Sequence, residues 1–312
     1  MKKNIMRLTS LLMACTVIFS ANTFVYATET TEVEESTDSD EVVISEDDKP
    51  YLSLGADLSA EQQHTVLSLM GINAEDLDEY NVQYVTNDEE HEYLDAYIPS
   101  ENIGSRSLSS VVIVEAEEGD GISISTYNIN YCTVGMYKNA CATAGITDAD
   151  IIVAGPFSIS GTAALLGIFK AYEEMTGEDL NDDVVDAAMD ELVTTGELNE
   201  SIDGDSEDVE ALIADLKQQL ADGNLDSDED ILAAIDETAT KYDLTLSEAD
   251  KEKILELLNK LKGLDLDWDS IANQASAWAD KLGDIDIDTD GLLDKIGNFF
   301  QKLIDAIKSL FS

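Results

Sequence analysis

Four aspartates near the C-terminus are spaced like ligands of a calcium-binding loop, at positions 1, 3, 5 and 9. They are Asp286, Asp288, Asp290 and Asp294. Carboxylate oxygens suit a hard cation, and Gly291 at position 6 permits the sharp turn. Position 12, where a bidentate glutamate normally closes the cage, is Gly297. We therefore expect an acidic linker that ends in a helix cap, with calcium as the alternative, and no other cofactor.

A second candidate for metal chemistry is His91, which lies one helical turn before Asp95 and would supply half of a metal site. A zincin pattern needs a second histidine at position 95, but the only other histidine, His64, lies elsewhere. We predict an exposed polar helix face instead. The 67 acids place carboxylates close together by chance, so no glycosidase-type pair can be chosen and no catalytic residue is assigned.

Residues 155–162 follow an expected strand and open an expected helix, where free N–H groups and the helix dipole would favour an anion. The two glycines, Gly155 and Gly161, are one residue too far apart for a phosphate loop, and no lysine follows the second. We therefore predict that Ser160 simply caps the helix. No Gly-x-Ser-x-Gly pattern surrounds either serine, so a hydrolase nucleophile has no support.

The elements that would position these residues divide the chain near Gly177. Before it, strands are expected at 82–86, 108–115, 122–131 and 151–154, and helices at 59–70, 88–97, 134–144 and 161–175. Ser59 and Gln62 form a capping-box pattern at the first helix. The order β-α-β-β-α-β, flanked by helices, predicts a ferredoxin-like α+β sandwich over residues 51–177.

Residues 178–312 show helical periodicity throughout and predict an all-α region. Its last helix, 291–312, has a strongly apolar face and a locally positive charge from Lys295, Lys302 and Lys308. We expect this helix to close the helical domain. The alternative is that it lies on a membrane surface or binds a partner groove.

The N-terminus predicts export. Residues 1–27 contain no acid, and basic residues precede an apolar stretch over 8–19 and small residues at Val25 and Ala27, which is typical of a secretory signal peptide. The alternative is a lipoprotein anchored at Cys15, because residues 12–15 resemble a lipobox. Residues 28–50 are acidic and poor in large apolar side chains, which predicts a disordered spacer. No later segment is apolar enough to form a transmembrane helix.

Composition limits the partners. With 17 Lys+Arg against 67 Asp+Glu, the formal net charge is −50, which excludes nucleic acid as a partner because phosphate backbones would repel the protein. After cleavage two cysteines remain, Cys132 and Cys141. An oxidising compartment favours a disulfide, but mostly helical residues between them would hold the Cα atoms roughly 12–13 Å apart. We predict buried free thiols, while a later helix start would allow the bridge.

Several short stretches carry a resemblance to a known family. They are YKNA at 137–140, AGITDA at 144–149, SGTAAL at 160–165 and MTG at 175–177. Over roughly residues 51–280 the chain resembles the YpuA-like secreted proteins of Gram-positive bacteria, a domain of unknown function (one thousand and two). The resemblance implies export and one composite architecture, and it transfers no activity, cofactor or catalytic residue.

These observations leave three classes of function. The first, which we favour, is a secreted, strongly acidic extracellular or envelope protein that acts by binding an unknown partner and is not an enzyme. The second is a hydrolase that uses acidic residues, which would require a cleft with two facing carboxylates of raised pKa. The third is a peripheral membrane protein attached through its C-terminal helix.

Overall fold

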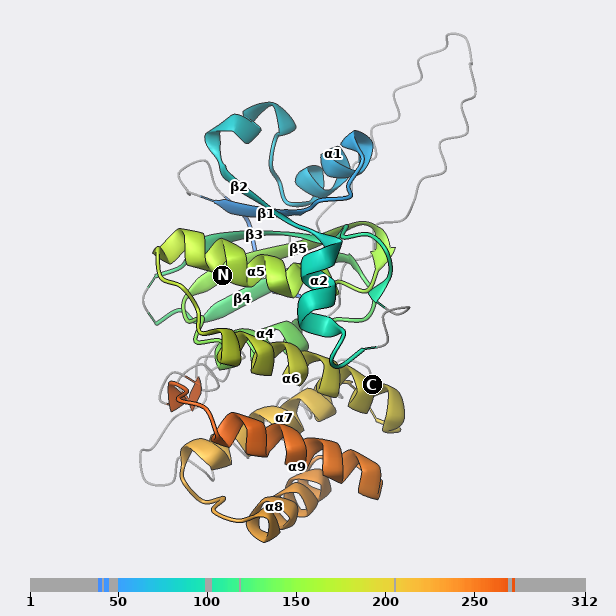
Figure 1. Ribbon diagram of the computed structural model, residues 1–312, viewed down its shortest axis with the longest axis vertical. Coiled ribbons are helices and arrows are strands. Elements are labelled where there is room, and N and C mark those ends of the chain that lie inside the picture. The colour runs from blue at the N-terminus through green and yellow to red at the C-terminus, as the bar shows by residue number, and fades with distance from the viewer. Residues whose placement is uncertain are drawn as a thin grey trace, which may run out of the picture. The chain divides into compact units, whose positions relative to one another are not determined.

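The computed structural model describes residues 39–40, 42–44, 50–98, 103–117, 119–204, 206–268 and 271–272 (Figure 1). This part of the chain is a mixed α+β structure, as the sequence predicts. The predicted signal peptide, the aspartate loop at 286–294 and the helix at 291–312 lie outside the described residues. No helix in the described part is long and apolar enough to cross a membrane.

A five-stranded sheet has the order β2-β1-β3-β5-β4. The strands are β1 (Tyr51–Gly55), β2 (Asn81–Val85), β3 (Ser110–Glu115), β4 (Ile122–Ile129) and β5 (Ala149–Ile159). β1 and β2 pair in parallel, as do β4 and β5, and β3 runs antiparallel to both β1 and β5. Four strands therefore point one way, and the middle strand points the other.

The ferredoxin-like topology predicted from the sequence is wrong in its strand order. In the ferredoxin-like order, the expected strands at 108–115 and 122–131 would pair with each other. They correspond to β3 and β4, which do not pair, because β5 lies between them and pairs with both. β5 carries buried apolar side chains on both faces over 151–154, which suits an interior strand, whereas Ser123 and Ser125 alternate with isoleucines along the edge strand β4. The prediction also missed β1, a short strand directly after the expected spacer.

Helices cover both faces of the sheet (Figure 1). α1 (Ala60–Leu69) packs on the face that holds Leu52 and Val112. α4 (Val134–Thr143) and α5 (Thr162–Thr176) pack on the opposite face with Ile113. Because side chains alternate along a strand, each central strand contributes to both cores.

A short helix, α2 (Asn87–Leu94), follows β2 and packs against α5 and α6. The remaining helices are α6 (Asp182–Ser201), α7 (Ser206–Ala221), α8 (Asp228–Lys241) and α9 (Glu248–Lys262). α6 buries Met189 and Leu192 in the core beneath the sheet, and Ala187 and Leu198 in a second core with α7–α9. Helix α6 therefore contributes side chains to both cores. The division into domains at residue 177 stays a prediction.

Three residues of the predicted spacer, Ser39, Asp40 and Val42, form hydrogen bonds along the outer edge of β4. Asp40 N donates to Ile124 O over 2.9 Å, and Ile124 N donates to the Asp40 carboxylate over 2.7 Å. The Asp40 carboxylate also pairs with Lys138 of α4 at 2.7 Å. The segment therefore satisfies backbone groups of an edge strand that would otherwise be open to pairing with another chain.

Candidate functional site

The carboxyl ends of β1, β2, β4 and β5 lie at the same end of the strands, which we call the carboxyl edge of the sheet. Helices α2, α4 and α5 begin there. In sheets with parallel strands, this edge is where ligands usually bind. Three ionisable side chains are buried at this edge: Glu90, Cys132 and Tyr137. These three residues form the first candidate site.

Glu90 is 2% exposed and has neutral hydrogen-bond donors. Thr162 Oγ1 donates to its carboxyl over 3.3 Å and Asn87 Nδ2 over 3.4 Å. No lysine or arginine among the described residues forms an ion pair with it. Burial raises the pKa of Glu90 to about 7, although the bonds from Asn87 and Thr162 oppose the shift. This carboxyl therefore titrates near neutral pH.

The start of α5 differs from the prediction made for residues 155–162. The N-cap is Gly161, with φ +92°, and no side chain caps the helix, so the prediction of a Ser160 cap is wrong. The backbone turns into the helix one residue later than expected, in a left-handed conformation that glycine adopts readily. Thr162, the first helical residue, donates to Glu90. The chain thus places one of its own carboxyl groups where the sequence suggested an external anion.

The two cysteines are free and buried, which confirms the prediction. Burial raises the pKa of the Cys132 thiol to about 12, and the nearby Glu90 adds to this shift. Burial also raises the pKa of Cys141. Both thiols are therefore protonated at neutral pH, and neither is an activated nucleophile.

His91 uses both ring nitrogens. Nδ1 lies 2.8 Å from Asp95 Oδ1, and Nε2 lies 3.0 Å from Gly104 O. Two acceptors favour the doubly protonated ring, so the bond to Asp95 and the bond to Gly104 raise the pKa of His91. The ring therefore ties α2 to the segment at 103–107 and has no nitrogen free for a metal. In the described part of the chain, no group of three or more suitable side chains could hold a metal ion.

A second buried polar cluster joins α4, α6 and α7. Lys217 Nζ lies 2.8 Å from Glu191 Oε1, and both residues are almost fully buried. Thr143 donates its hydroxyl to the other Glu191 oxygen, and Lys217 also donates to Asn139 O over 2.8 Å. The charges are thus paired and hydrogen-bonded, as buried charges must be. Sequence reasoning missed this cluster, because its members are far apart in the chain and lie in ordinary helical patterns.

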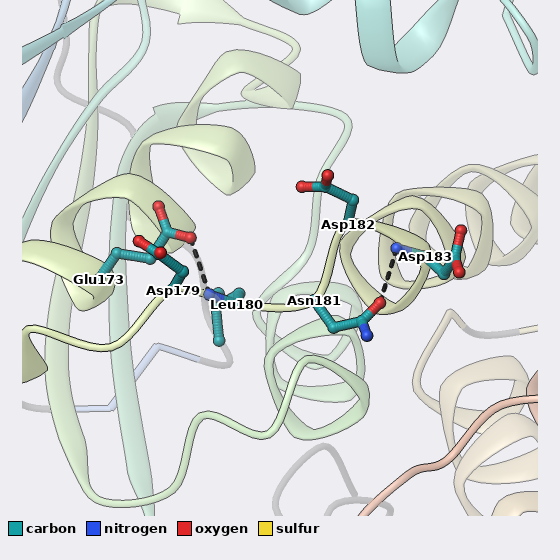
Figure 2. Close-up of a pocket in the computed structure, with 6 residues that line it drawn as sticks. All are labelled: Glu173, Asp179, Leu180, Asn181, Asp182 and Asp183. Atoms are coloured by element: carbon teal, nitrogen blue, oxygen red, sulfur yellow. Dashed lines mark hydrogen bonds between the residues drawn. The ribbon is translucent and has the colours of Figure 1, made fainter.

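An acidic hollow of about 630 Å³ opens where the α5–α6 connection meets the start of α6 (Figure 2). Its lining residues are Glu173, Asp179, Leu180, Asn181, Asp182 and Asp183. Two backbone amides are satisfied inside this set, since Leu180 N donates to Glu173 over 2.8 Å and Asp183 N donates to Asn181 over 2.9 Å. The carboxylates of Asp179, Asp182 and Asp183 belong to exposed residues. The hollow offers negative charge to solvent.

Every lysine that the structure describes donates to an oxygen of the protein itself. Lys138, Lys170, Lys217, Lys241, Lys251, Lys253 and Lys260 pair with carboxylates, and Lys262 donates to two backbone carbonyls. Most of these contacts join different elements, such as Lys260 of α9 with Asp186 and Asp190 of α6. The charges of these lysines are therefore used in internal contacts, and exposed carboxylates remain on the surface.

The described part of the chain is thus an α+β protein. It has a mixed sheet flanked by helices, buried polar clusters whose groups are paired with one another, and an acidic surface. The chain belongs to the protein family of unknown function DUF1002, whose model matches residues 54–278. It is 40% identical over 263 residues to the uncharacterized protein YpuA of Bacillus subtilis (strain 168), a match that covers 83% of this chain and 89% of that protein. No solved structure gives a significant match.

Proposed function

We propose that the protein is exported and acts outside the cell, or in the envelope, as a non-enzymatic binding protein for a positively charged partner. One observation carries the proposal: the lysines of the described part are engaged in internal contacts, and exposed carboxylates remain. The formal net charge of −50 then produces a negative field around the protein. Such a field attracts cationic partners and accelerates their association.

The non-enzymatic part of the proposal rests on the chemistry of the buried groups. Glu90 shares its site with the neutral side chains of Asn87 and Thr162, and the thiol of Cys132 is held protonated by burial. A hydrolase that uses carboxylates needs two that face each other across a space for substrate. The geometry around Glu90 instead suits a group that is satisfied from within the fold.

Binding is tested by calorimetry on the full chain with decalysine as the probe, at about 50 mM and 300 mM salt. We expect binding at low salt that weakens steeply at high salt, because exposed charges are screened. An affinity that is absent at low salt, or that does not change with salt, would contradict the proposal. The double variant Asp179→Asn/Asp182→Asn tests the acidic hollow (Figure 2).

The matched control is Glu229→Gln/Glu237→Gln, which removes the same charge from exposed positions of α8. If the hollow contributes specifically, its variant binds more weakly than the control. If both variants lose affinity equally, the whole acidic surface attracts the partner and no single site does. Both results support the proposed class, and they differ only in where the partner sits.

Export is tested by N-terminal sequencing of the protein recovered from culture medium. The residues around Val25 and Ala27 predict that the mature chain begins at Thr28. An acylated Cys15 at the mature N-terminus would instead establish the lipoprotein alternative. The calcium proposal for Asp286, Asp288, Asp290 and Asp294, and the membrane proposal for residues 291–312, concern segments outside the described residues.

A further inference from the structure

We propose that Glu90 and His91 form a pH-operated clasp, which holds α2 and the segment at 103–107 against the start of α5 in mild acid and loosens as the pH rises through neutral. The proposal is independent of the binding function above. It concerns the attachment of one short helix to its neighbours, which rests on two adjacent titratable side chains.

The first half of the clasp is the buried carboxyl of Glu90. It touches α5 through the hydroxyl of Thr162 and its own helix through Asn87, and the buried hydroxyl of Ser107 lies beside it. All three neighbours are neutral. A protonated carboxyl fits this environment, whereas an ionised one finds no cation among these three neighbours. The charge of protonated His91 lowers the pKa of Glu90 but does not cancel the larger effect of burial. Ionisation of Glu90 therefore works against the packing of α2 on α5.

The second half is His91, on the next residue of the same helix. Its ring bonds Asp95 on α2 and the backbone oxygen of Gly104, so the protonated ring fastens the 103–107 segment to α2. Asn87 Nδ2 reaches the same oxygen over 3.5 Å. A neutral ring carries only one N–H and must give up one of its two bonds. Loss of the proton from His91 therefore loosens the same contact that ionised Glu90 loosens.

Other ionisable groups around α2 are already engaged or stay in one state. On α2 itself, Glu89 pairs with Lys170 of α5 at 2.7 Å. Before α4, the Cys132 thiol faces Glu90, and burial raises its pKa to about 12. From α6, Asp186 accepts the hydroxyl of Tyr97, and Asp182 lies near Tyr93. None of these groups replaces the proton that Glu90 or His91 loses near neutral pH.

The sign follows from linkage. Burial raises the pKa of Glu90 from 4.5 to about 7, so the closed clasp binds a proton more tightly than the open one between these values. The bonds to Asp95 and Gly104 raise the pKa of His91, so its contribution also disappears as the pH rises through the raised value. Both residues therefore favour the closed clasp in acid. Their titrations are coupled, because the positive charge of His91 lowers the pKa of Glu90 and the negative charge of Glu90 raises the pKa of His91.

The test is hydrogen exchange of the full chain, followed by mass spectrometry and corrected for the intrinsic pH dependence of exchange. We expect protection of peptides from α2 and 103–107 to fall by about tenfold between pH 6 and pH 8, since a pH unit between the two pKa values changes the equilibrium about tenfold. In Glu90→Gln, which keeps a neutral side chain at all pH values, most of this change should disappear. Glu92→Gln, an exposed position on the same helix, is the matched control and should keep the wild-type profile.

Wild-type protection that stays constant from pH 6 to pH 8 would overturn the proposal, and so would an undiminished pH dependence in Glu90→Gln. A second measurement does not depend on any variant. The side-chain carboxyl of Glu90, observed by carbon-13 NMR in the wild-type protein, should titrate near neutral pH. A midpoint close to the ordinary value of 4.5 would also reject the clasp.

Discussion

Two of the buried glutamates in the described part of the chain, Glu191 and Glu90, have contrasting surroundings. Glu191, between α4, α6 and α7, has an ammonium partner in Lys217 at 2.8 Å and accepts a hydroxyl from Thr143. Glu90, at the carboxyl edge of the sheet, has only neutral donors. A carboxylate paired with a cation joins its helices through that ion pair, whereas an unpaired buried carboxyl adapts by binding a proton. Equal burial thus gives one fixed joint and one that responds to pH.

The largest effect is expected when the fixed joint loses one charge. Lys217→Met leaves Glu191 buried without its cation, and we expect the protein to lose about 3–5 kcal/mol of unfolding free energy. Urea unfolding at pH 7 measures this loss. The double variant Glu191→Leu/Lys217→Met removes both charges and should be more stable than the single variant. If the double variant loses as much unfolding free energy as Lys217→Met and Glu191→Leu lose together, the two residues are not coupled and the geometry is contradicted.

Replacement of Glu90 is expected to have a smaller effect on stability, and at high pH it should stabilise the protein. Because its pKa is raised from 4.5 to about 7, its ionisation lowers stability as the pH rises through this range, by at most about 3 kcal/mol. At pH 8, Glu90→Gln should therefore be more stable than wild type in urea, and at pH 5 the two should be similar. The comparison with Glu191 fails if Glu90→Gln is strongly destabilised at pH 8.

Sequence patterns predicted the local features of the fold well. Ser59 caps α1 in a capping box with Gln62, as expected, because this signal depends on residues three positions apart. The two cysteines are buried and free, as expected from the helix that begins after Cys132. The strand order could not be predicted in the same way. The order depends on which strand best tolerates burial on both faces. In this sheet β5 lies between β3 and β4.

The candidate sites show the same limit. At the start of α5, the sequence pattern predicted a Ser160 cap, with an external anion as the alternative. In the structure the N-cap is Gly161, and the carboxyl of Glu90 on α2 accepts a hydrogen bond from Thr162. Glu90 and Thr162 are 72 positions apart, so no motif joins them. The Lys217–Glu191 pair was missed for the same reason. Chemistry between distant residues appears only when the packing is known.

A moderate effect is expected at Tyr97, which connects the α2 region to the helical part. Its hydroxyl donates to Asp186 over 2.7 Å and accepts from Lys260 over 2.7 Å. Tyr97→Phe removes both bonds and keeps the ring, so we expect a loss of about 1–2 kcal/mol. Urea unfolding with Tyr93→Phe as the neighbouring control measures it. An equal loss in both variants would show that the Tyr97 hydroxyl is not a special link between Glu90's helix and the helices around Glu191.

The smallest effect is expected from calcium, because Glu90 and Glu191 are buried and calcium would meet mainly the exposed carboxylates. With a net charge of −50, divalent cations should relieve self-repulsion through many weak contacts. A weak site that is half occupied adds only about 0.4 kcal/mol, so millimolar calcium should raise the melting temperature modestly. Magnesium should act nearly as well at equal ionic strength, since loose carboxylate contacts do not select between the ions. The decisive comparison is Asp288→Ala, which should leave the calcium effect almost unchanged. A saturable isotherm at micromolar calcium that this substitution abolishes would instead establish a true loop site at Asp286, Asp288, Asp290 and Asp294.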